Sequence, residues 1–347
     1  MRVLVTGGAG FVGSHCAEYF AAKKAKVMVV DNLMRSAIFG SSRKSVEYNW
    51  DYLSGIKNIT LVKKDIRDAA AMKKLFKQFK PDAVIHTAGQ PGVRFSLEDP
   101  TEDFTINAAG TLSVLEALRH ANPRAKLVYC STNKVYGDRV NALPIRSTTK
   151  RYMFKDSPGV DEDFGIDLTG HTPYGVSKLA GDLYVQDHAY VYSMESVVFR
   201  MSCIYGTRQF GFEDQGWLAW FSIQHMQGRP VTIYGDGKQI RDVLWVGDLV
   251  NAFDAVIRSS KKLGGEVFNI GGGGNNTLSL LELVDHLGRI TGRGLKVKYD
   301  DWRKFDQKVY VSDISKAKRV LGWRPKVGVR EGIERLAGWV AANPKLF

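Results

Sequence analysis

Tyr174 and Lys178 form the pair of residues in this sequence best suited to proton transfer. On a helix, residues four apart lie on the same face, so the lysine ammonium can lower the pKa of the phenol and let it act as a base near neutral pH. Thr132, at the end of an apolar run, adds a hydroxyl that can hydrogen-bond the reacting oxygen. A Tyr-x-x-x-Lys pair is common on helix surfaces, so its meaning depends on the elements that position it.

The N-terminal segment predicts a strand, a glycine-rich turn, a helix and a second strand that ends in Asp31. The turn contains Gly7, Gly8, Gly10 and Gly13. Such glycines let backbone N–H groups approach a pyrophosphate, and the helix N-terminus adds the positive end of its dipole. Asp31 lies where a carboxylate would accept hydrogen bonds from both ribose hydroxyls and repel a 2′-phosphate. The pattern therefore predicts NAD as the cofactor, with Lys178 also placed to hold its nicotinamide ribose.

Strands alternate with helices over the first 200 residues. This alternation predicts an α/β fold, a Rossmann-type doubly wound parallel sheet whose ligands bind beyond the carboxyl ends of the strands. The predicted strands are 2–6, 26–30, 59–63, 83–87, 126–130 and 196–200, and the predicted helices are 11–23, 69–78, 101–121 and 174–193.

The rest of the chain predicts a smaller, discontinuous C-terminal substrate lobe. We expect an NAD-binding domain at 1–200 with a return segment at about 236–262, and a substrate-binding lobe at 201–235 and 263–347. Residues 138–172 lack periodicity and predict a long functional loop. The later elements are a short strand at 231–234 and helices at 216–227, 248–258, 279–291 and 330–341.

Composition limits the possible partners and the compartment. The chain has 347 residues and a formal net charge of +13, but its basic residues are dispersed and fit no nucleic-acid-binding motif, whereas a basic surface suits a ligand with several phosphates. The first strand begins at Arg2 and no apolar run reaches membrane-spanning length, so we expect a cytoplasmic protein without a membrane partner. Cys16, Cys130 and Cys203 lack metal-ligand spacing and are expected to be reduced thiols.

From residue 2 to about 340 these features resemble the extended short-chain dehydrogenase/reductase superfamily of nucleotide-sugar epimerases and dehydratases. The resemblance implies a homodimer or homotetramer with helices 101–121 and 174–193 at the interface, although these helices could equally pack internally. It also implies a set of cofactor-binding residues in this sequence: Gly7, Gly10, Phe11, Val12, Asp31, Asn32, Asp65, Ile66, Thr87, Ala88, Gly89, Asn107, Ser131, Tyr174, Lys178 and Arg200.

The two residues after Thr132 separate the members of this superfamily. In its 4,6-dehydratases these residues are Asp and Glu, which protonate the leaving hydroxyl and abstract a ring proton. Here they are Asn133 and Lys134, and neither readily performs that acid–base work. The remaining reaction is hydride removal and return, which requires Tyr174, Thr132, Lys178 and NAD.

Several short segments resemble the CDP-tyvelose (CDP-paratose) 2-epimerases, among them residues 131–138, 208–210, 214–217 and 237–239. The resemblance implies a CDP-linked or other nucleotide-linked hexose that is inverted at C2, as in a pathway such as lipopolysaccharide sugar synthesis. Residues 90–96 are also similar to uronate 4-epimerases, so a UDP-sugar 4-epimerase is the alternative. The expected substrate-binding residues, with the diphosphate at the last two, are Gln90, Asn133, Lys134, Arg208, Gln209, Gln215, Arg241 and Arg303.

Other interpretations stay open. Trp217 is a further candidate for a nucleotide or sugar contact. It could instead serve packing, as could Arg208, Gln209 and Gln215, and a surface salt bridge is the alternative for Arg241 and Arg303. His171 is either an auxiliary acid or a hydrogen-bonded loop histidine. At the level of the whole protein, the rivals are a non-catalytic NAD sensor, which has no need of Tyr174, Lys178 and Thr132 together, and a dehydrogenase that releases NADH.

Overall fold

The structure, a computed structural model, describes residues 1–35, 43–303 and 305–347. These residues form two compact units. Unit 1 contains residues 1–135, 172–200 and 250–268, and unit 2 contains residues 136–171, 201–249 and 269–347. The chain therefore leaves unit 1 and returns to it twice.

Unit 1 is built on a seven-stranded sheet with the order β12-β8-β5-β4-β1-β2-β3. β1 pairs in parallel with β2 and β4, and the β2–β3 and β4–β5 pairs are also parallel. Most of β1 and all of β4 are buried, as expected for parallel strands covered on both faces. The strands are β1 (Arg2–Thr6), β2 (Lys26–Asp31), β3 (Ile59–Lys63), β4 (Ala83–His86), β5 (Lys126–Thr132), β8 (Ser196–Met201) and β12 (Val267–Ile270).

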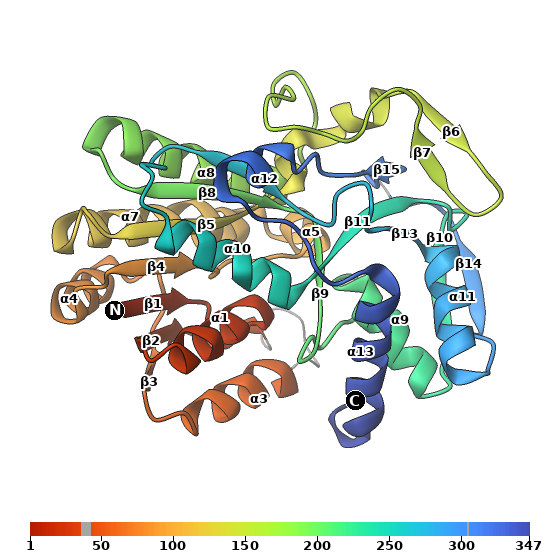
Figure 1. Ribbon diagram of the computed structural model, residues 1–347, viewed down its shortest axis with the longest axis horizontal. Coiled ribbons are helices and arrows are strands. Elements are labelled where there is room, and N and C mark those ends of the chain that lie inside the picture. The colour runs from red at the N-terminus through yellow and green to blue at the C-terminus, as the bar shows by residue number, and fades with distance from the viewer. Residues whose placement is uncertain (36–42, 304) are drawn as a thin grey trace. The chain divides into compact units, whose positions relative to one another are not determined.

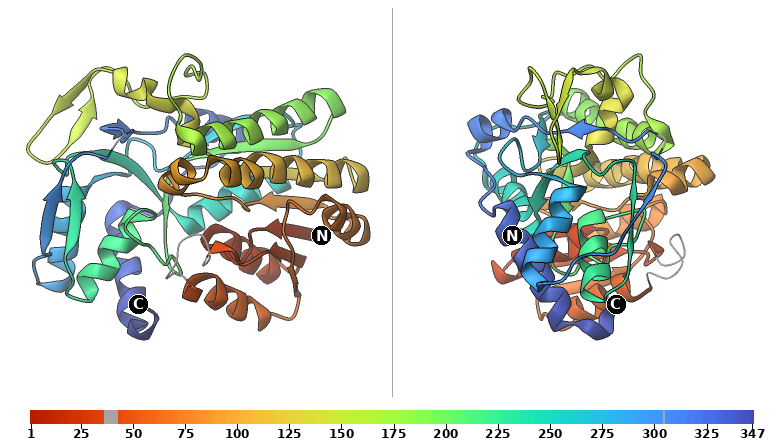
Figure 2. Two further views of the ribbon diagram at one scale, coloured as in Figure 1. Left: turned by 180° about the vertical axis from the view of Figure 1, so that it is seen from behind. Right: turned by 90° about the vertical axis from the view of Figure 1, so that its right-hand side faces the viewer.

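Helices cover both faces of this sheet. Figure 1 shows α1 and α10 in front of the strands, and the reverse view in Figure 2 shows α7 and α8 in front of them. α1 is tied to α10 by a 3.0 Å hydrogen bond from Tyr19 to Asp254. The helices associated with this unit are α1 (Phe11–Ala22), α3 (Arg43–Ser54), α4 (Ala69–Phe79), α5 (Val93–Glu98), α6 (Pro100–Phe104), α7 (Gly110–Ala121), α8 (Thr172–Tyr192) and α10 (Val246–Arg258).

The helix predicted at 101–121 is interrupted. Between α6 and α7 the chain makes a π-helical turn, η1 (Thr105–Ala109). The turn includes the buried Asn107, whose backbone carbonyl accepts a 2.6 Å hydrogen bond from the Thr111 hydroxyl. Such widened turns are frequent at functional sites, and here the turn lies beside α8.

Unit 2 consists of small sheets and helices. β11 pairs with β13, β15 and β9, β10 pairs in parallel with β14, and β6 and β7 form a separate antiparallel pair. The strands are β6 (Ile145–Ser147), β7 (Tyr152–Phe154), β9 (Cys203–Tyr205), β10 (Val231–Tyr234), β11 (Ile240–Trp245), β13 (Thr277–Ser279), β14 (Val297–Asp300) and β15 (Val309–Tyr310). The helices are η2 (Asn133–Ala142), which begins in unit 1, α9 (Trp217–Met226), α11 (Leu280–Thr291), α12 (Ser315–Leu321), α13 (Val329–Ala342) and η3 (Pro344–Leu346).

The two units differ in their bounds from the domains expected from sequence. Residues 136–171 pack with unit 2, because Tyr152 donates its backbone N–H to Lys238 and Arg151 forms an ion pair with Glu282. The part of the chain that returns to unit 1 is 250–268 rather than 236–262, because it leads into β12 at the edge of the sheet. The assignment of substrate binding to the second unit stays a prediction.

Two further observations concern the chain as a whole. In the part of the chain that the structure describes, no helix is long and apolar enough to cross a membrane. Cys16 and Cys130 are free thiols and are buried, and Cys203 is partly exposed.

Candidate active site

The glycine turn after β1 is shaped for close backbone approach. Gly7 has a φ of +68°, and a Cβ atom at this position would lie 2.5 Å from the backbone nitrogen of Ala88. The Thr87 hydroxyl donates to the carbonyl of Thr6 at 2.6 Å and so joins the end of β4 to the turn. Because no side chain fits at residue 7, the turn presents bare backbone ahead of α1, where a pyrophosphate would bind. Three other predicted cofactor residues follow directly: Gly10, which caps α1, and Phe11 and Val12 in its first turn.

Asp31 is held at the carboxyl end of β2, next to the glycine turn. Its two carboxylate oxygens accept backbone N–H groups from Ala9 at 3.0 Å and from Leu33 at 2.8 Å. A carboxylate offers about four acceptor positions, so Asp31 can accept a further donor besides the backbone groups that already bind it. The geometry therefore fits a ribose hydroxyl of NAD.

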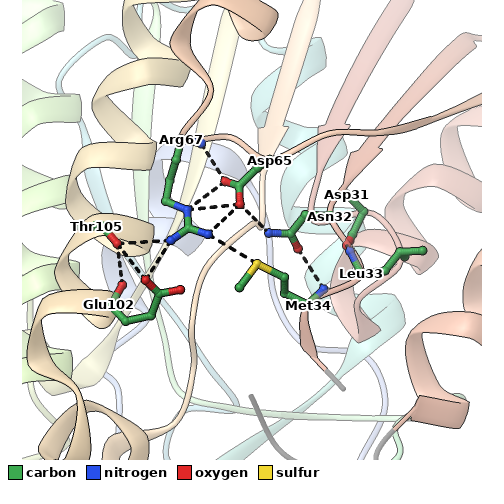
Figure 3. Close-up of polar contacts among 8 residues, drawn as sticks. All are labelled: Asp31, Asn32, Leu33, Met34, Asp65, Arg67, Glu102 and Thr105. Carbon is green, nitrogen blue, oxygen red and sulfur yellow. Dashed lines mark hydrogen bonds and ion pairs between the residues drawn. The ribbon is translucent and has the colours of Figure 1, made fainter. Parts of the chain in front are cut away.

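The predicted adenine end carries a denser polar network, shown in Figure 3. Asn32 donates its side-chain amide to Asp65 at 2.9 Å, and Asp65 is also bound by Arg67. Burial tends to raise the pKa of Asp65, but the hydrogen bonds from Arg67 outweigh it and the pKa falls below its usual value. Ile66 is buried in the core of the unit, and its contact with the cofactor stays a prediction.

Thr132, Tyr174 and Lys178 come together in unit 1. Thr132 ends β5, and the other two lie one turn apart on α8. All three are buried, and the hydroxyls of Thr132 and Tyr174 are hydrogen-bonded. The Lys178 Nζ lies 4.2 Å from the ring centre of Tyr129. Gly89 leaves room for Asn107, because a Cβ there would lie 2.9 Å from Asn107 Oδ1, whereas its 3.7 Å distance from Lys178 Nζ would be an ordinary contact.

Burial moves the pKa values of this pair in opposite directions. It raises the pKa of Tyr174 to about 12, opposed by the hydrogen bond from Thr132. It lowers the pKa of Lys178 to about 8, opposed by the negative charges around it. Perturbed, buried groups of opposite type are typical of acid–base sites. In its protonated form Lys178, one turn along α8 from Tyr174, would favour the phenolate, which is the form required of a base.

A buried polar network lies beneath Lys178. Asp103, which is fully buried, accepts hydrogen bonds from Gln90 at 2.7 Å, Asn107 at 3.1 Å and Ser177 at 2.5 Å. Asn107 also accepts the backbone N–H of Gln90 at 2.8 Å and donates to Ser177 at 3.1 Å. The network joins the loop after β4, the π-helical turn and α8. The Gln90 side chain, predicted to bind substrate, is thus already engaged by the protein.

A second buried network holds the end of β5 and the end of β8. Ser131 donates to Asp182 at 2.8 Å, and Arg200 forms an ion pair with the same carboxylate at 3.0 Å. The Arg200 side chain, predicted to contact the cofactor, therefore has an internal partner that accounts for its burial. Its contact with cofactor stays a prediction.

The residues after Thr132 offer no carboxylate at this point of the site. Asn133 is buried and its side-chain oxygen lies 3.4 Å from the Thr132 hydroxyl. The Lys134 backbone N–H is 3.3 Å from the same hydroxyl. An amide oxygen beside Thr132 can accept a hydrogen bond, but it cannot serve as a general acid at neutral pH.

In unit 2 the two arginines predicted to bind a diphosphate already have protein partners. Arg241 pairs with Asp306 at 2.5 Å and donates to the carbonyl of Gln307 at 2.6 Å. Arg303 pairs with Asp214 at 3.1 Å and lies 4.0 Å over the ring of Tyr234. Their role as phosphate ligands stays a prediction that would require part of these contacts to be exchanged.

The remaining predicted substrate residues lie around the start of α9. Arg208 is buried at a φ of +57°, and the Gln209 amide donates to the carbonyl of Ile204 at 3.2 Å. Gln215 pairs with Phe212 through the backbone, and Trp217 packs edge to face on Phe221. Elsewhere in unit 2, His171 Nε2 lies 2.7 Å from the carbonyl oxygen of Ile166, the arrangement of a hydrogen-bonded loop histidine.

Three residues of these networks were not singled out from the sequence. Asp103 lies four positions before Asn107, and Asp182 lies four positions after Lys178, so each shares a helix side with a predicted site residue. Ser177 directly precedes Lys178. These spacings place Asp103 and Asp182 on the same helix side as predicted site residues, but they do not show that the two carboxylates are buried.

The comparisons with known proteins agree with this geometry. Residues 3–271 match the model of the NAD dependent epimerase/dehydratase family. The chain is 38% identical to CDP-paratose 2-epimerase from Salmonella typhi, over 99% of this chain and all of that protein. It is 32% identical to UDP-glucuronate 4-epimerase from Thermodesulfobacterium geofontis, over 99% and 97% of the two chains.

A solved structure of a 4-epimerase has the same fold as this chain. UDP-glucuronic acid 4-epimerase from Bacillus cereus, in complex with UDP-glucuronic acid and NAD, superposes on the whole of this chain with a TM-score of 0.83 at 27% identity, and all of that chain is covered. The predicted Rossmann-type fold, the predicted superfamily and NAD as the cofactor are confirmed. The chain belongs to the NAD dependent epimerase/dehydratase family.

Proposed function

We propose that this protein is an NAD-dependent nucleotide-sugar epimerase that interconverts CDP-paratose and CDP-tyvelose by inversion at C2 of the sugar. The observation that carries the proposal is the 38% identity with CDP-paratose 2-epimerase over the full length of both chains. The buried arrangement of Thr132, Tyr174 and Lys178 supports the chemistry. Asn133 and Lys134, in place of an acidic pair, argue against elimination of water.

In the proposed reaction, bound NAD would accept a hydride from the sugar carbon and return it to the opposite face. Gly7, the N-terminal turn of α1 and Asp31 would hold it. The Tyr174 phenolate takes the proton of the sugar hydroxyl, and the sugar carbon becomes a planar ketone. After the keto sugar has rotated within the site, Tyr174 returns the proton. Thr132 donates to the developing oxyanion, and Lys178 keeps the phenolate stable by its charge.

The proposed rotation of the keto sugar requires that the substrate be held at a group away from the sugar ring. Arg241 and Arg303 are the proposed anchor for the diphosphate, since a guanidinium group matches phosphate oxygens in charge and geometry. The remaining proposed substrate residues are Gln90, Asn133, Lys134, Arg208, Gln209 and Gln215.

A direct test of the proposed function uses two substrates in parallel. The holoprotein is incubated with CDP-paratose and, separately, with UDP-glucuronate, and NMR locates the inverted carbon. We expect inversion at C2 of CDP-paratose, no net release of NADH, and no deuterium at C2 when the reaction runs in heavy water. Inversion confined to C4 of the UDP-sugar would replace the proposal by the 4-epimerase alternative. Deuterium at the inverted carbon would contradict hydride return.

The 4-epimerase is the second candidate because a specific observation favours it. Its chemistry is the same at a different ring carbon, and UDP-glucuronate 4-epimerase is 32% identical over nearly the whole chain. Residues 90–96 are similar to the uronate 4-epimerases. The first of them, Gln90, donates its side-chain amide to Asp103 and to the carbonyl of Gly92.

The pH dependence of the proposed reaction should respond to Asp103. Besides Asp103, the groups that face Lys178 and Tyr174 are Asp182 on α8, Cys130 and Tyr129 on β5, and His86 on β4. The Asp103 charge raises the pKa of both Tyr174 and Lys178, because a nearby anion favours their protonated forms.

Asp103→Asn should therefore move the whole profile of kcat against pH to lower pH, by roughly half a unit or more. Tyr174 and Lys178 would both lose their protons at lower pH, so both limbs of the profile move in the same direction. Asp254→Asn, which removes the same charge elsewhere in unit 1, is the matched control and should leave both limbs in place. A profile of Asp103→Asn that coincides with wild type would show that Asp103 has only a structural role.

We also propose a cytoplasmic homodimer or homotetramer with a nucleotide sugar as its small-molecule partner. The free thiols of Cys16 and Cys130 suit a reducing compartment. Large apolar side chains are exposed along α8, namely Val176, Leu183, Tyr184, Tyr190, Val191 and Tyr192. Such a row supports contact with a second copy. Sedimentation equilibrium gives the mass directly, and a monomer at micromolar concentration would contradict the proposal.

A further inference from the structure

Arg67 lies in the turn between β3 and α4, and its guanidinium bridges two carboxylates from different segments. It binds Asp65 through Nε at 3.1 Å and through a terminal nitrogen at 2.8 Å. Its other terminal nitrogen binds Glu102 of α6 at 2.9 Å. Figure 3 shows the guanidinium between these two acids, with two of its nitrogens directed at Asp65 and the third at Glu102. All three side chains are partly buried, which reduces the screening of their charges by solvent.

The same guanidinium reaches a third segment, the loop after β2. Arg67 lies 3.4 Å from the sulfur of Met34, and the Met34 backbone N–H donates to Asn32 at 3.0 Å. Asn32 in turn donates to Asp65 at 2.9 Å. Residues 31–34, 65–67 and 102–105 are therefore linked through one side chain, because Arg67 also contacts the Thr105 hydroxyl at 3.4 Å.

These three segments lie where the adenosine half of NAD would bind. Asp31, the proposed acceptor for the ribose hydroxyls, begins the first segment. β2 and β3 are parallel neighbours whose ends meet at Asp31 and Lys63, so the turn after β3 lies at the same edge of the sheet. Ligands of such folds bind beyond this edge. Contact of Arg67 with the cofactor is not required, since its donors are already engaged by protein groups.

We infer that Arg67 is a positioning residue that closes the adenosine side of the site and so retains NAD between turnovers. The charge balance shows why. Asp31, Asp65 and Glu102 bring three carboxylates to a site for an anionic diphosphate, and Arg67 is the cation that binds two of them. Without it, these carboxylates repel each other and the cofactor. Asn32 still binds Asp65, but the link through Arg67 to Glu102 and Thr105 is lost. Slow cofactor loss suits a reaction that returns its hydride in place, and in that respect the inference rests on the proposed function.

The test measures cofactor release rather than sugar turnover. The protein is loaded with NADH, an excess of NAD is added, and the fall in bound NADH fluorescence gives the dissociation rate. Arg67→Ala should release NADH at least about tenfold faster than wild type, equivalent to about 1.4 kcal/mol. Arg67→Lys, which keeps the charge but loses the fork, should lie between the two. Glu102→Gln breaks the ion pair between Arg67 and α6 and leaves Asp65 paired. It should increase the rate by a smaller factor, because it also removes a carboxylate that repels the cofactor.

Arg94→Ala is the matched control. Arg94 is an exposed arginine of unit 1, paired with Glu98 on its own helix α5, and its removal should leave the rate unchanged. A rate for Arg67→Ala within twofold of wild type, or an equal increase in Arg94→Ala, would overturn the inference. So would an increase in Arg67→Ala without any increase in Glu102→Gln, because the bridge between segments would then be irrelevant. No sugar is present, so the result stands whether or not the epimerase activity is found.

Discussion

Tyr174→Phe should lower kcat for epimerisation by about 10²–10⁴-fold, the range typical for loss of a positioned acid–base group. The phenol oxygen is the only group proposed to take the proton of the sugar hydroxyl. Water cannot replace it readily, because Tyr174 is buried beside Thr132. A phenylalanine ring fills the same volume, and the Thr132 hydroxyl keeps Asn133 as a neighbour at 3.4 Å. The folded protein should therefore retain NAD while losing turnover.

The control for this variant is Tyr19→Phe, which removes a phenol oxygen of the same unit that binds Asp254 instead. It should turn over at the wild-type rate. The measurement is the rate of inversion followed by NMR at saturating substrate, with the NAD content of each protein determined after denaturation. A Tyr174→Phe enzyme within tenfold of wild type would remove Tyr174 from the mechanism. Unchanged function of that variant in cells would favour an NAD sensor.

The cofactor half of the site could be predicted from sequence because its signals are local. An apolar run, four glycines within seven residues and an aspartate after the next apolar run predict β1, the turn and β2 without reference to the rest of the chain. The spacing of Tyr174 and Lys178 predicts a shared helix side, and α8 provides it. In such local patterns, the spacing of the residues in the sequence determines their geometry in the fold.

The polar networks could not be predicted, because they join residues far apart in the chain. Asp103 meets Ser177 across 74 positions, and Arg67 meets Glu102 across 35. Nothing in the residue types shows which carboxylate will be buried. The interruption of the helix at 105–109 was also missed, since its sequence suits a continuous helix and the π-helical turn depends on tertiary contacts of Asn107.

The short strands in segment 138–172 could not be predicted from the sequence either. This segment was expected to be a loop, but it contains the short strands β6 and β7. Three-residue strands are too short for a periodic pattern to be recognised. Arg151, in the turn between the two strands, forms an ion pair with the distant Glu282 of unit 2 at 2.6 Å. Folding of this segment follows from its partners rather than from its own sequence.

Asp182→Ala should destabilise the protein by about 3–5 kcal/mol, the cost typical of leaving one member of a buried ion pair without its partner. Asp182 is fully buried and Arg200 is almost so, with their charged atoms 3.0 Å apart. The alanine would leave the Arg200 guanidinium in the interior without its carboxylate, and Ser131 without the acceptor that it binds at 2.8 Å. The free energy of unfolding in urea measures the loss. Glu98→Ala, which breaks an exposed pair on α5, should cost no more than about 0.5 kcal/mol.

A double variant separates the charge from the packing. Asp182→Leu combined with Arg200→Leu removes both charges and replaces them with apolar side chains, so it should be more stable than Asp182→Ala alone. If instead the double variant is the less stable protein, the pair contributes more than mutual neutralisation and the argument from buried charge fails. The same protein tests the predicted contact of Arg200 with cofactor. Retention of NAD at the wild-type dissociation rate would assign the Arg200 side chain to the stability of unit 1, because the cofactor would then bind equally well without it.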